Sequence, residues 1–284
     1  SILSKEIFRI NFSGAKNYVL KTSYVAIIFV LFTVPLVYPD PSSGNWISVV
    51  DIPPTILTGG TTFPPTNDWL ETLDWIKNNT DKDAVIASWW DYGYWITTMS
   101  DRTTFIDNST LIDSRIKHMA KIFLSSPDEG WNMLNEWNAN YVVIFITAER
   151  LENFSNSGER LYVLGKGGDE TKAQWFIRIA GLPIQEYLHS DFFTINNNLL
   201  NNTLLGKMIP YTPIAYYDQS TGQSWTEFRP GFIPLYVEDI QYMSENSPLK
   251  LVYSSPSFNN DKNGSMNIVL VYEINPNYVV LNSP

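Results

Sequence analysis

The sequence has no cysteine, only two histidines and few basic residues, and each shortage excludes a kind of chemistry. Without cysteine, a disulfide framework and thiolate sites for metals or redox reactions are excluded. With two histidines, a histidine-rich zinc site or a Ser-His-Asp triad is not expected. The 19 basic residues face 29 acidic ones, and a net charge of −10 disfavours nucleic acid as a partner, because its binding requires neutralised phosphates. The chemistry must therefore come from carboxylates, amides and aromatic rings, or it lies outside this chain.

Apolar and aromatic residues are abundant. Hydrophobic residues make up 44% of the 284 positions and aromatic residues 14%, which excludes a disordered chain. This length and composition suffice for one large domain or two modest ones with a buried core.

One long uncharged stretch lies near the start of the chain. Residues 24–38 read YVAIIFVLFTVPLVY, and with their flank they predict a transmembrane helix over residues 22–38. The stretch is shorter than the roughly 20 residues of a typical span, so a buried core helix is the alternative.

Charge is distributed unevenly around this stretch. The segment before it is basic and the rest of the chain is acidic; its basic residues are Lys5, Arg9, Lys16 and Lys21. The positive-inside rule then predicts that residues 1–21 are cytoplasmic and that the chain after about residue 39 is on the extracytoplasmic side of the cell membrane. A start at Ser1 within a basic loop leads us to expect the tail of a longer integral membrane protein.

Composition divides the chain into five expected parts. Pro, Gly, Ser and Thr are frequent between the apolar stretch and residue 66, which is typical of an extended connector. The parts are a cytoplasmic loop (1–21), a transmembrane helix (22–38), a connector (39–66), a central α/β domain (67–180) and a β-rich C-terminal part (181–284).

Helices and strands alternate in the central domain. One predicted helix begins at about residue 68, and two others cover residues 114–124 and 128–137. The predicted strands cover residues 84–90, 102–106 and 141–146. This alternation predicts an α/β (mixed α+β) fold with a mostly parallel central sheet.

The pattern changes after residue 150. From there on, the predicted elements are strands at 161–164, 175–179, 250–253 and 267–274 and a short helix at 201–208. The last two strands are joined by Asn-Asp-Lys-Asn-Gly, a good hairpin signal. The β-rich C-terminal part is expected either to pack on the central domain or to be continuous with it.

Two short motifs resemble those of a known family. The first is Trp89-Trp90-Asp91-Tyr92-Gly93, at the end of a predicted strand. The second begins at Asp169 and continues with Lys172 and Phe176, similar to the pattern Asp-x-x-Lys-x-x-x-Met/Ile, with Phe176 in the last place. The chain thereby resembles the C-terminal portion of the catalytic subunit of oligosaccharyltransferase, of the archaeal AglB type and the related eukaryotic subunit. Residues 66–180 carry most of this resemblance.

The resemblance implies an enzyme that transfers a lipid-linked oligosaccharide to Asn in Asn-x-Ser/Thr sequons, with this chain as its acceptor-recognition part. The implied site for the sequon Ser or Thr consists of Trp89, Trp90, Asp91, Tyr92, Gly93, Asp169, Lys172 and Phe176. The implied partners are the acceptor polypeptide, the lipid-linked oligosaccharide and the membrane.

The resemblance also implies a metal, Mn²⁺ or Mg²⁺, bound by acidic residues on external loops of an N-terminal transmembrane region. That region is not in this sequence, so we expect no catalytic or metal-binding residue here and no transferase activity from this chain alone. A compact acidic exterior favours an archaeal single-subunit enzyme.

The first motif suits recognition of a small hydroxyl group. Indole N–H groups of Trp89 and Trp90 only donate hydrogen bonds, and the Asp91 carboxylate only accepts them. Together they satisfy both the lone pairs and the proton of a Ser or Thr hydroxyl. Such a site rejects an analogue without the hydroxyl, because its own polar groups are then left unpaired.

Other interpretations of the same residues remain open. The pentapeptide alone is also typical of a corner of the aromatic core that contains a hydrogen-bonded Asp. Asp169 and Lys172 alone are also typical of a solvated pair on the surface of a helix. The alternative function is a membrane-anchored extracellular carbohydrate-binding or adhesion module with exposed tryptophans.

Overall fold

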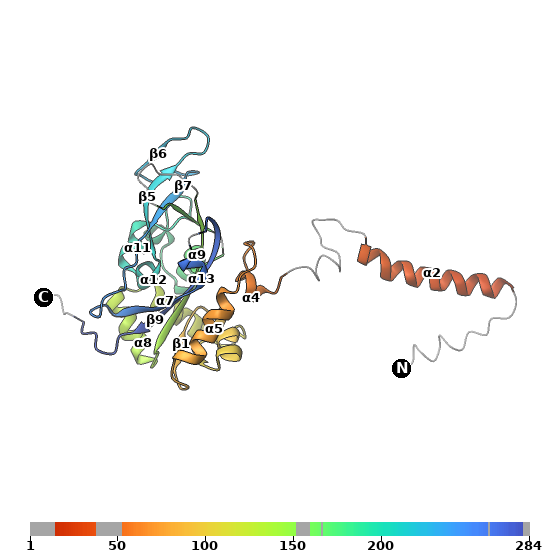
Figure 1. Ribbon diagram of the computed structural model, residues 1–284, viewed down its shortest axis with the longest axis horizontal. Helices are drawn as coiled ribbons and strands as arrows, with labels where there is room; N and C mark the ends of the chain where they lie inside the picture. The colour runs from red at the N-terminus through yellow and green to blue at the C-terminus, as the bar shows by residue number, and fades with distance from the viewer. Residues whose placement is uncertain (1–14, 38–52, 152–159, 166, 261, 281–284) are drawn as a thin grey trace. The chain divides into compact units, whose positions relative to one another are not determined.

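The computed structural model describes residues 15–37, 53–151, 160–165, 167–260 and 262–280 (Figure 1). The chain divides into two compact units, Ser1–Pro53 and Pro54–Pro284. Both sequence motifs lie in the second unit, so the candidate site is built by that unit.

The described part of the first unit is a single helix, α2 (Ala15–Val37). It covers most of residues 22–38, where the sequence predicts a membrane span. Among the helices of the described residues, none combines the length and the apolarity needed to cross a bilayer, so the helix is confirmed but the span is not. The part of α2 after Lys21 rises about 24 Å at 1.5 Å per residue, which is less than the roughly 30 Å hydrocarbon core of a bilayer.

In its described residues, the second unit is built on one nine-stranded sheet. Its strands follow the order β2-β1-β3-β4-β7-β5-β6, with β9 also paired to β3 and β8 paired to β9. Their bounds are β1 (Val85–Ala87), β2 (Thr103–Thr104), β3 (Tyr141–Arg150), β4 (Tyr162–Leu164), β5 (Tyr211–Tyr217), β6 (Ser224–Trp225), β7 (Ile233–Glu238), β8 (Leu249–Ser254) and β9 (Gly264–Ile274).

The sheet is mixed, which corrects the prediction of a mostly parallel one. β1 is parallel to β2 and to β3, whereas the other pairings among these strands are antiparallel. Parallel neighbours need a crossover connection, and helices connect β1 to β2 and β2 to β3. The helices between β4 and β5 do not join neighbouring strands, because β7 lies between those two.

Helices precede, connect and follow these strands. Their bounds are α4 (Thr55–Thr58), α5 (Asp68–Asn79), η1 (Trp90–Tyr92), α6 (Gly93–Trp95), η2 (Ile96–Ser100), α7 (Asp113–Leu124), α8 (Pro127–Glu136), α9 (Asp169–Ala180), α10 (Ile184–Tyr187), α11 (Asn197–Asn202), α12 (Leu204–Met208) and α13 (Pro256–Asn259). The three helices predicted in the central domain are confirmed as α5, α7 and α8. At the start of α8, Pro127 occupies the first turn and the Ser126 hydroxyl accepts a hydrogen bond from the Glu129 N–H, as expected of a capped helix.

Three predicted elements differ from the structure. Residues 175–179, predicted as a strand, belong to α9, whose buried residues recur at helical spacing; five apolar positions were too few to distinguish the two periods. The strand predicted over 84–90 ends at Ala87, because Trp90 already begins a 3₁₀ turn. The helix predicted over 201–208 is two helices, separated at Thr203.

The C-terminal part is continuous with the central domain. The predicted hairpin is confirmed as the antiparallel pair of β8 and β9. β9 then pairs with the whole length of β3, from Tyr141 opposite Glu273 to Arg150 opposite Gly264. One sheet therefore runs through both parts of the sequence, with β3 at its centre.

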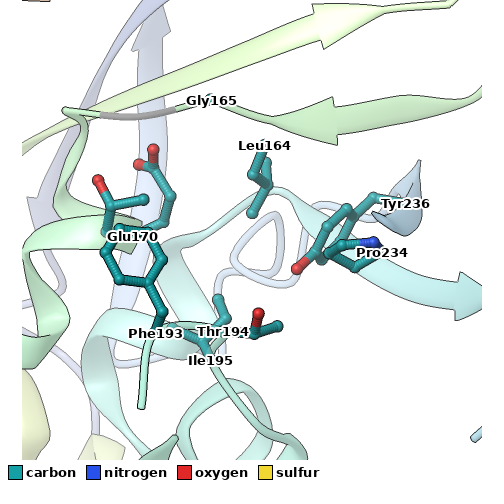
Figure 2. A pocket seen from close by; sticks show the side chains of 9 residues that line it. Leu164, Gly165, Glu170, Phe193, Thr194, Ile195, Pro234 and Tyr236 are labelled. Atoms are coloured by element: carbon teal, nitrogen blue, oxygen red, sulfur yellow. The ribbon is translucent and has the colours of Figure 1, made fainter. Parts of the chain in front are cut away.

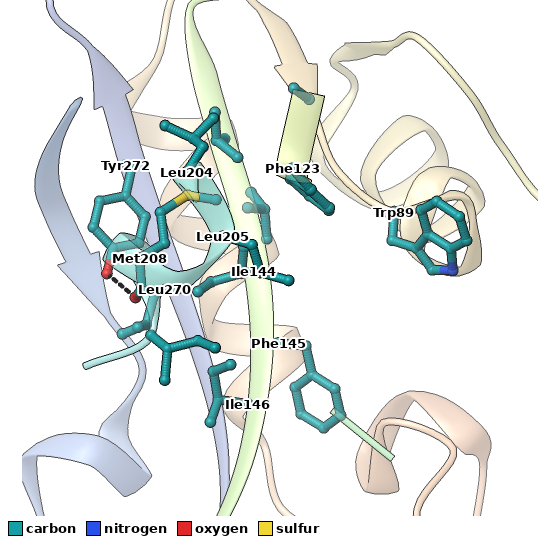
Figure 3. Packing of buried hydrophobic residues seen from close by; sticks show 14 of the residues in the cluster. Trp89, Phe123, Ile144, Phe145, Ile146, Leu204, Leu205, Met208, Leu270 and Tyr272 are labelled. Atoms are coloured by element: carbon teal, nitrogen blue, oxygen red, sulfur yellow. Dashed lines mark hydrogen bonds between the residues drawn. The ribbon is translucent and has the colours of Figure 1, made fainter. Parts of the chain in front are cut away.

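β3 is buried on both faces. Ile144 and Ile146 project from one face, toward Leu205 and Met208 of α12, and Phe145 projects from the other (Figure 3). On the first side the Tyr272 hydroxyl donates to the Met208 carbonyl at 2.6 Å. Because residues 142–148 of β3 are buried on both faces, this strand is a rigid support for the elements that pack on it.

Candidate functional site

The first motif lies where β1 ends and a helix begins. Trp89 is still extended, with φ −65° and ψ 149°, and the next three residues form η1. Gly93 continues into α6 with an ordinary helical φ of −57°. The chain therefore turns from strand to helix here, and Gly93 does not supply an unusual backbone angle.

Glycine is needed at position 93 because another chain segment passes very close. A Cβ atom there would lie 2.4 Å from the Ile106 carbonyl oxygen and 2.6 Å from the Asp107 Cα. The segment after β2 is thus packed directly against the motif, and the Asn108 amide group connects the two. Asn108 Nδ2 donates to the Asp91 carbonyl at 2.9 Å, and Asn108 Oδ1 accepts from the Tyr94 N–H at 3.2 Å.

We expect Gly93→Ala to lower the free energy of unfolding by about 2 kcal/mol, because backbone atoms must move to admit the methyl group. Urea denaturation measures this change. Gly222→Ala is the matched control, since φ is +73° there but no atom lies within 4 Å of the added Cβ; it reports backbone strain alone, about 1 kcal/mol. A neutral Gly93→Ala would contradict the close packing.

The two motifs meet in one hydrogen-bonded network. Lys172 Nζ lies 2.6 Å from Asp91 Oδ2 and donates to the Tyr92 hydroxyl at 2.9 Å. The Tyr92 hydroxyl in turn donates to Asp169 Oδ1 at 2.8 Å. The backbone N–H of Phe145, in the middle of β3, donates to Asp169 Oδ2 at 2.9 Å. The network thus connects the first turn of α9, the motif after β1 and the central strand.

This network extends from the surface to the interior. The side chains of Asp91 and Lys172 are 27% and 18% exposed, whereas Tyr92 and Asp169 are fully buried. Burial raises the pKa of Asp169 to about 6, although the Lys172 charge and the two donated hydrogen bonds oppose the rise. Asp91 and Lys172 are therefore the members that a ligand can reach, and Tyr92 and Asp169 hold them in place.

The aromatic residues of the site likewise include buried ones and one that is partly accessible. Trp89 and Phe176 are buried, and their ring centroids lie 4.3 Å apart. Trp90 is half-buried, and its ring centroid lies 6.4 Å from that of Trp89. The sequence predicted that both indoles and Asp91 face one ligand; in the structure Trp90 has access to solvent and Trp89 forms part of the core.

Two residues near the network were not predicted. Trp175 lies one helical turn after Lys172 and is 52% exposed, with the Arg178 guanidinium 5.3 Å from its ring centroid. Glu170, next to Asp169, is fully buried, and its carboxylate accepts from the Thr147 hydroxyl at 3.0 Å. Because residues 175–179 were predicted as a strand, the helical spacing that places Trp175 one turn after Lys172 was not recognised.

Within the described ranges, no group of three or more His, Cys, Asp or Glu side chains could hold a metal ion. The two histidines instead stack on aromatic rings, His118 on Trp137 at 4.4 Å and His189 on Phe228 at 3.9 Å between centroids.

Similarity to known proteins includes the segment that carries the first motif. The profile of the STT3/PglB/AglB core domain matches residues 81–162. Subunit STT3 of the dolichyl-diphosphooligosaccharide–protein glycosyltransferase of Saccharomyces cerevisiae is 30% identical over 195 residues, which are 63% of this chain and 24% of that protein. The chain spans about a quarter of the length of such curated relatives.

Two solved structures from Archaeoglobus fulgidus are also similar. The C-terminal globular domain of an oligosaccharyltransferase is 20% identical, with 75% of this chain and 99% of that chain covered and a TM-score of 0.41. An oligosaccharyltransferase tethered to an acceptor peptide with an NVT sequon is 14% identical, with 82% and 27% covered and a TM-score of 0.37. Both TM-scores are below 0.5, so the relationship rests on the sequences.

Proposed function

We propose, from the homology of this chain to the C-terminal globular region of STT3/PglB/AglB oligosaccharyltransferase catalytic subunits, that it binds the Ser or Thr of an acceptor sequon. The observation that carries this proposal is the joining of the two motifs through Lys172, which contacts both Asp91 and Tyr92. This contact supports a shared role for residues that are 81 positions apart in the sequence.

The proposed contacts with the hydroxyl come from the accessible residues. The Asp91 carboxylate accepts a hydrogen bond from the hydroxyl group, and the Trp90 indole N–H donates one to the hydroxyl oxygen. Lys172 holds the Asp91 carboxylate in place. A side chain without a hydroxyl leaves the Trp90 N–H and one Asp91 oxygen unpaired, which is the basis of selection.

The buried residues of the predicted site have positioning roles in this proposal. Trp89 and Phe176 form the wall behind Trp90, and Gly93 admits the segment after β2. Tyr92 and Asp169 orient Lys172 from the interior. These roles follow from their burial and replace the direct contact that the sequence suggested for them.

The activity proposed for the whole protein is transfer of an oligosaccharide from a lipid carrier to the Asn of Asn-x-Ser/Thr sequons, on the extracytoplasmic side of the cell membrane. The donor and Mn²⁺ or Mg²⁺ would be bound by parts outside this chain. This chain then supplies acceptor recognition, and its proposed partner is the acceptor polypeptide.

Peptide binding by the 284-residue chain tests this proposal. We expect an Asn-x-Thr peptide to bind at least about tenfold more tightly than Asn-x-Ala, because one unpaired buried polar group costs on the order of 1–3 kcal/mol. Asp91→Ala should abolish this preference, and Asp83→Ala, an exposed turn residue, should keep it. Isothermal titration gives both affinities.

Equal affinity of the two peptides for the unaltered chain would overturn the acceptor proposal. It would favour a binding or adhesion module that uses exposed aromatic rings.

A further inference from the structure

The chain itself contains sequons of the kind that it is proposed to bind. Asn-x-Ser/Thr occurs six times in the sequence, and this pattern is the acceptor motif for glycans attached to surface loops. Two of the six, which begin at Asn11 and Asn153, lie outside the described residues. The other four begin at Asn78, Asn108, Asn201 and Asn263.

Two groups of a sequon must be reachable before a glycan can be attached to it. The amide nitrogen of the Asn forms the new bond, and the hydroxyl group two residues later is the group that a sequon-binding site pairs with. A hydrogen bond within the fold that occupies either group must first break. The hydrogen bonds and exposure of the four sequons therefore decide which of them accepts a glycan on the folded chain.

In the sequon of Asn78, the fold occupies both groups. Thr80 Oγ1 donates to the Ile76 carbonyl at 2.7 Å and accepts from Arg102 Nε at 2.8 Å. Asn78 is exposed, but its Nδ2 donates to the Asp74 carbonyl at 2.9 Å. These hydrogen bonds at the end of α5 must break before this sequon can bind.

In the sequon of Asn201, the hydroxyl group is buried. Thr203 is 2% exposed. Its Oγ1 donates to the Leu199 carbonyl at 2.7 Å and accepts from the Gly206 N–H at 3.0 Å. The second of these bonds caps α12, so release of Thr203 would also destabilise the start of that helix.

In the sequon of Asn108, the fold occupies the amide group. Its Nδ2 donates to the Asp91 carbonyl and its Oδ1 accepts from the Tyr94 N–H. The nitrogen that would take the glycan thus joins the segment after β2 to the first motif. Transfer to it requires the bond to Asp91 to break, beside the proposed acceptor site.

The sequon of Asn263 differs from these three. It lies where the chain enters β9, and both Asn263 and Ser265 are exposed. Between them, Gly264 has a φ of +111°, and a Cβ there would meet no atom of the described residues within 4 Å. The space beside this sequon is therefore open.

The backbone before this sequon is fixed, and the sequon itself lies at the end of a strand ladder. Arg150 Nη1 donates to the carbonyls of Asn260 and Lys262. Gly264 and Ser265 form the last two pairs between β9 and β3, and the end of a strand opens at small cost. The sequon can therefore leave the sheet while the rest of β9 stays paired.

The sequons lie apart from the half-open cavity of about 150 Å³ between β4, the start of α9 and β7 (Figure 2). None of the nine residues that line this cavity belongs to an Asn-x-Ser/Thr sequence. A glycan on Asn263 would therefore leave the lining of the cavity unchanged.

We propose that Asn263 is an N-glycosylation site of this protein and carries an oligosaccharide. In the transfer, Asn263 Nδ2 forms a bond to the anomeric carbon of the first sugar, and the bond from that carbon to a phosphate oxygen of the lipid carrier breaks. The phosphate oxygen keeps the electron pair, and Nδ2 gives one proton to a base of the transferring enzyme. The proposal rests on the extracytoplasmic location proposed above, but it does not depend on peptide binding by this chain.

Transfer by an added enzyme tests whether the fold exposes this sequon. The folded 284-residue chain is incubated with the purified dolichyl-diphosphooligosaccharide–protein glycosyltransferase of Saccharomyces cerevisiae and its lipid-linked oligosaccharide. Peptide mass spectrometry then quantifies the glycan on each Asn. We expect Asn263 to be modified at least about tenfold faster than the Asn of the other three described sequons, because those must first break hydrogen bonds.

A digest of the chain separates the effect of the fold from that of the local sequence. In peptides that each contain one sequon these hydrogen bonds are gone, so Asn263 should lose its advantage. Ser265→Ala removes the recognised hydroxyl group and should abolish transfer to Asn263, whereas Ser265→Thr is the matched control and should keep it. Faster transfer to another described sequon of the folded chain would overturn the proposal, as would a bare folded chain beside a modified digest.

Mass spectrometry of the whole protein from its own membranes is the second test, and we expect a glycan on the peptide that contains Asn263. A bare Asn263 in that sample, after rapid transfer in vitro, would overturn the proposal together with the extracytoplasmic location. Failure of transfer to the folded chain in vitro would overturn the proposal alone, because the added enzyme acts without a membrane side.

Discussion

Asp169→Ala is expected to lower the free energy of unfolding by on the order of 3–5 kcal/mol, because it leaves two buried donors unpaired at about 1–3 kcal/mol each and removes a countercharge of Lys172. The donors are the Tyr92 hydroxyl and the Phe145 N–H. The preference for Asn-x-Thr peptides should be lost as well, since Tyr92 then no longer positions Lys172 beside Asp91.

Urea denaturation and isothermal titration measure the two effects. Asp169→Asn keeps one acceptor oxygen and should lose about half as much stability, because only one of the two donors stays paired. Asp83→Ala, in an exposed turn, should change stability by no more than about 0.5 kcal/mol. A loss below about 1 kcal/mol for Asp169→Ala would mean that both donors find other acceptors.

Glu170→Gln is expected to be more stable than the unaltered chain at alkaline pH, by on the order of 5 kcal/mol at about 1.4 kcal/mol per pKa unit. Burial raises the pKa of Glu170 from 4.5 to about 8, so the folded chain holds this proton more tightly than the unfolded chain. Stability is then highest below about pH 4.5 and falls as the pH rises toward 8. An amide does not ionise, so the variant should lack this fall.

Denaturation at pH 5, 7 and 9 measures the difference. The two proteins should be close in stability at pH 5 and diverge at higher pH. Asp169, whose pKa burial raises to about 6, adds a smaller decline between about pH 4 and 6 that both proteins share. Glu149→Gln, on an exposed position of the same strand as Thr147, is the control and should follow the unaltered chain. Parallel curves for Glu170→Gln and the unaltered chain would contradict the buried, ionisable state of Glu170.

Local elements with strong signals could be predicted from the sequence. Cap residues before Trp69, the apolar spacing of residues 114–124 and the Pro127 start each lead to a helix that the structure contains. The hairpin of β8 and β9 was also evident, because a turn sequence separates two apolar runs. These patterns lie within about a dozen consecutive residues, so they depend little on the rest of the tertiary structure.

Sheet direction and strand neighbours could not be predicted in this way. The pairing of β9 with β3 joins residues more than 100 positions apart, and it depends on which apolar faces bury each other best. The alternation of helices and strands suggested parallel neighbours, which holds only around β1. Residues 175–179 were misassigned for a related reason, since a short buried run looks alike in a helix and in a strand.

The sequence by itself determined which residues resemble the two motifs, and it led to the prediction that a carboxylate and indole N–H groups recognise a hydroxyl group. Only the tertiary structure decided which of these side chains a ligand can reach. The accessible ones are Asp91, Lys172 and Trp90. The buried ones are Tyr92, Asp169 and Phe176. The tertiary structure alone decided that Glu170 is buried with an unpaired oxygen. The physical reason is that desolvation and hydrogen-bond partners are set by every element packed around a side chain, and here α9, β1 and β3 converge from distant parts of the sequence.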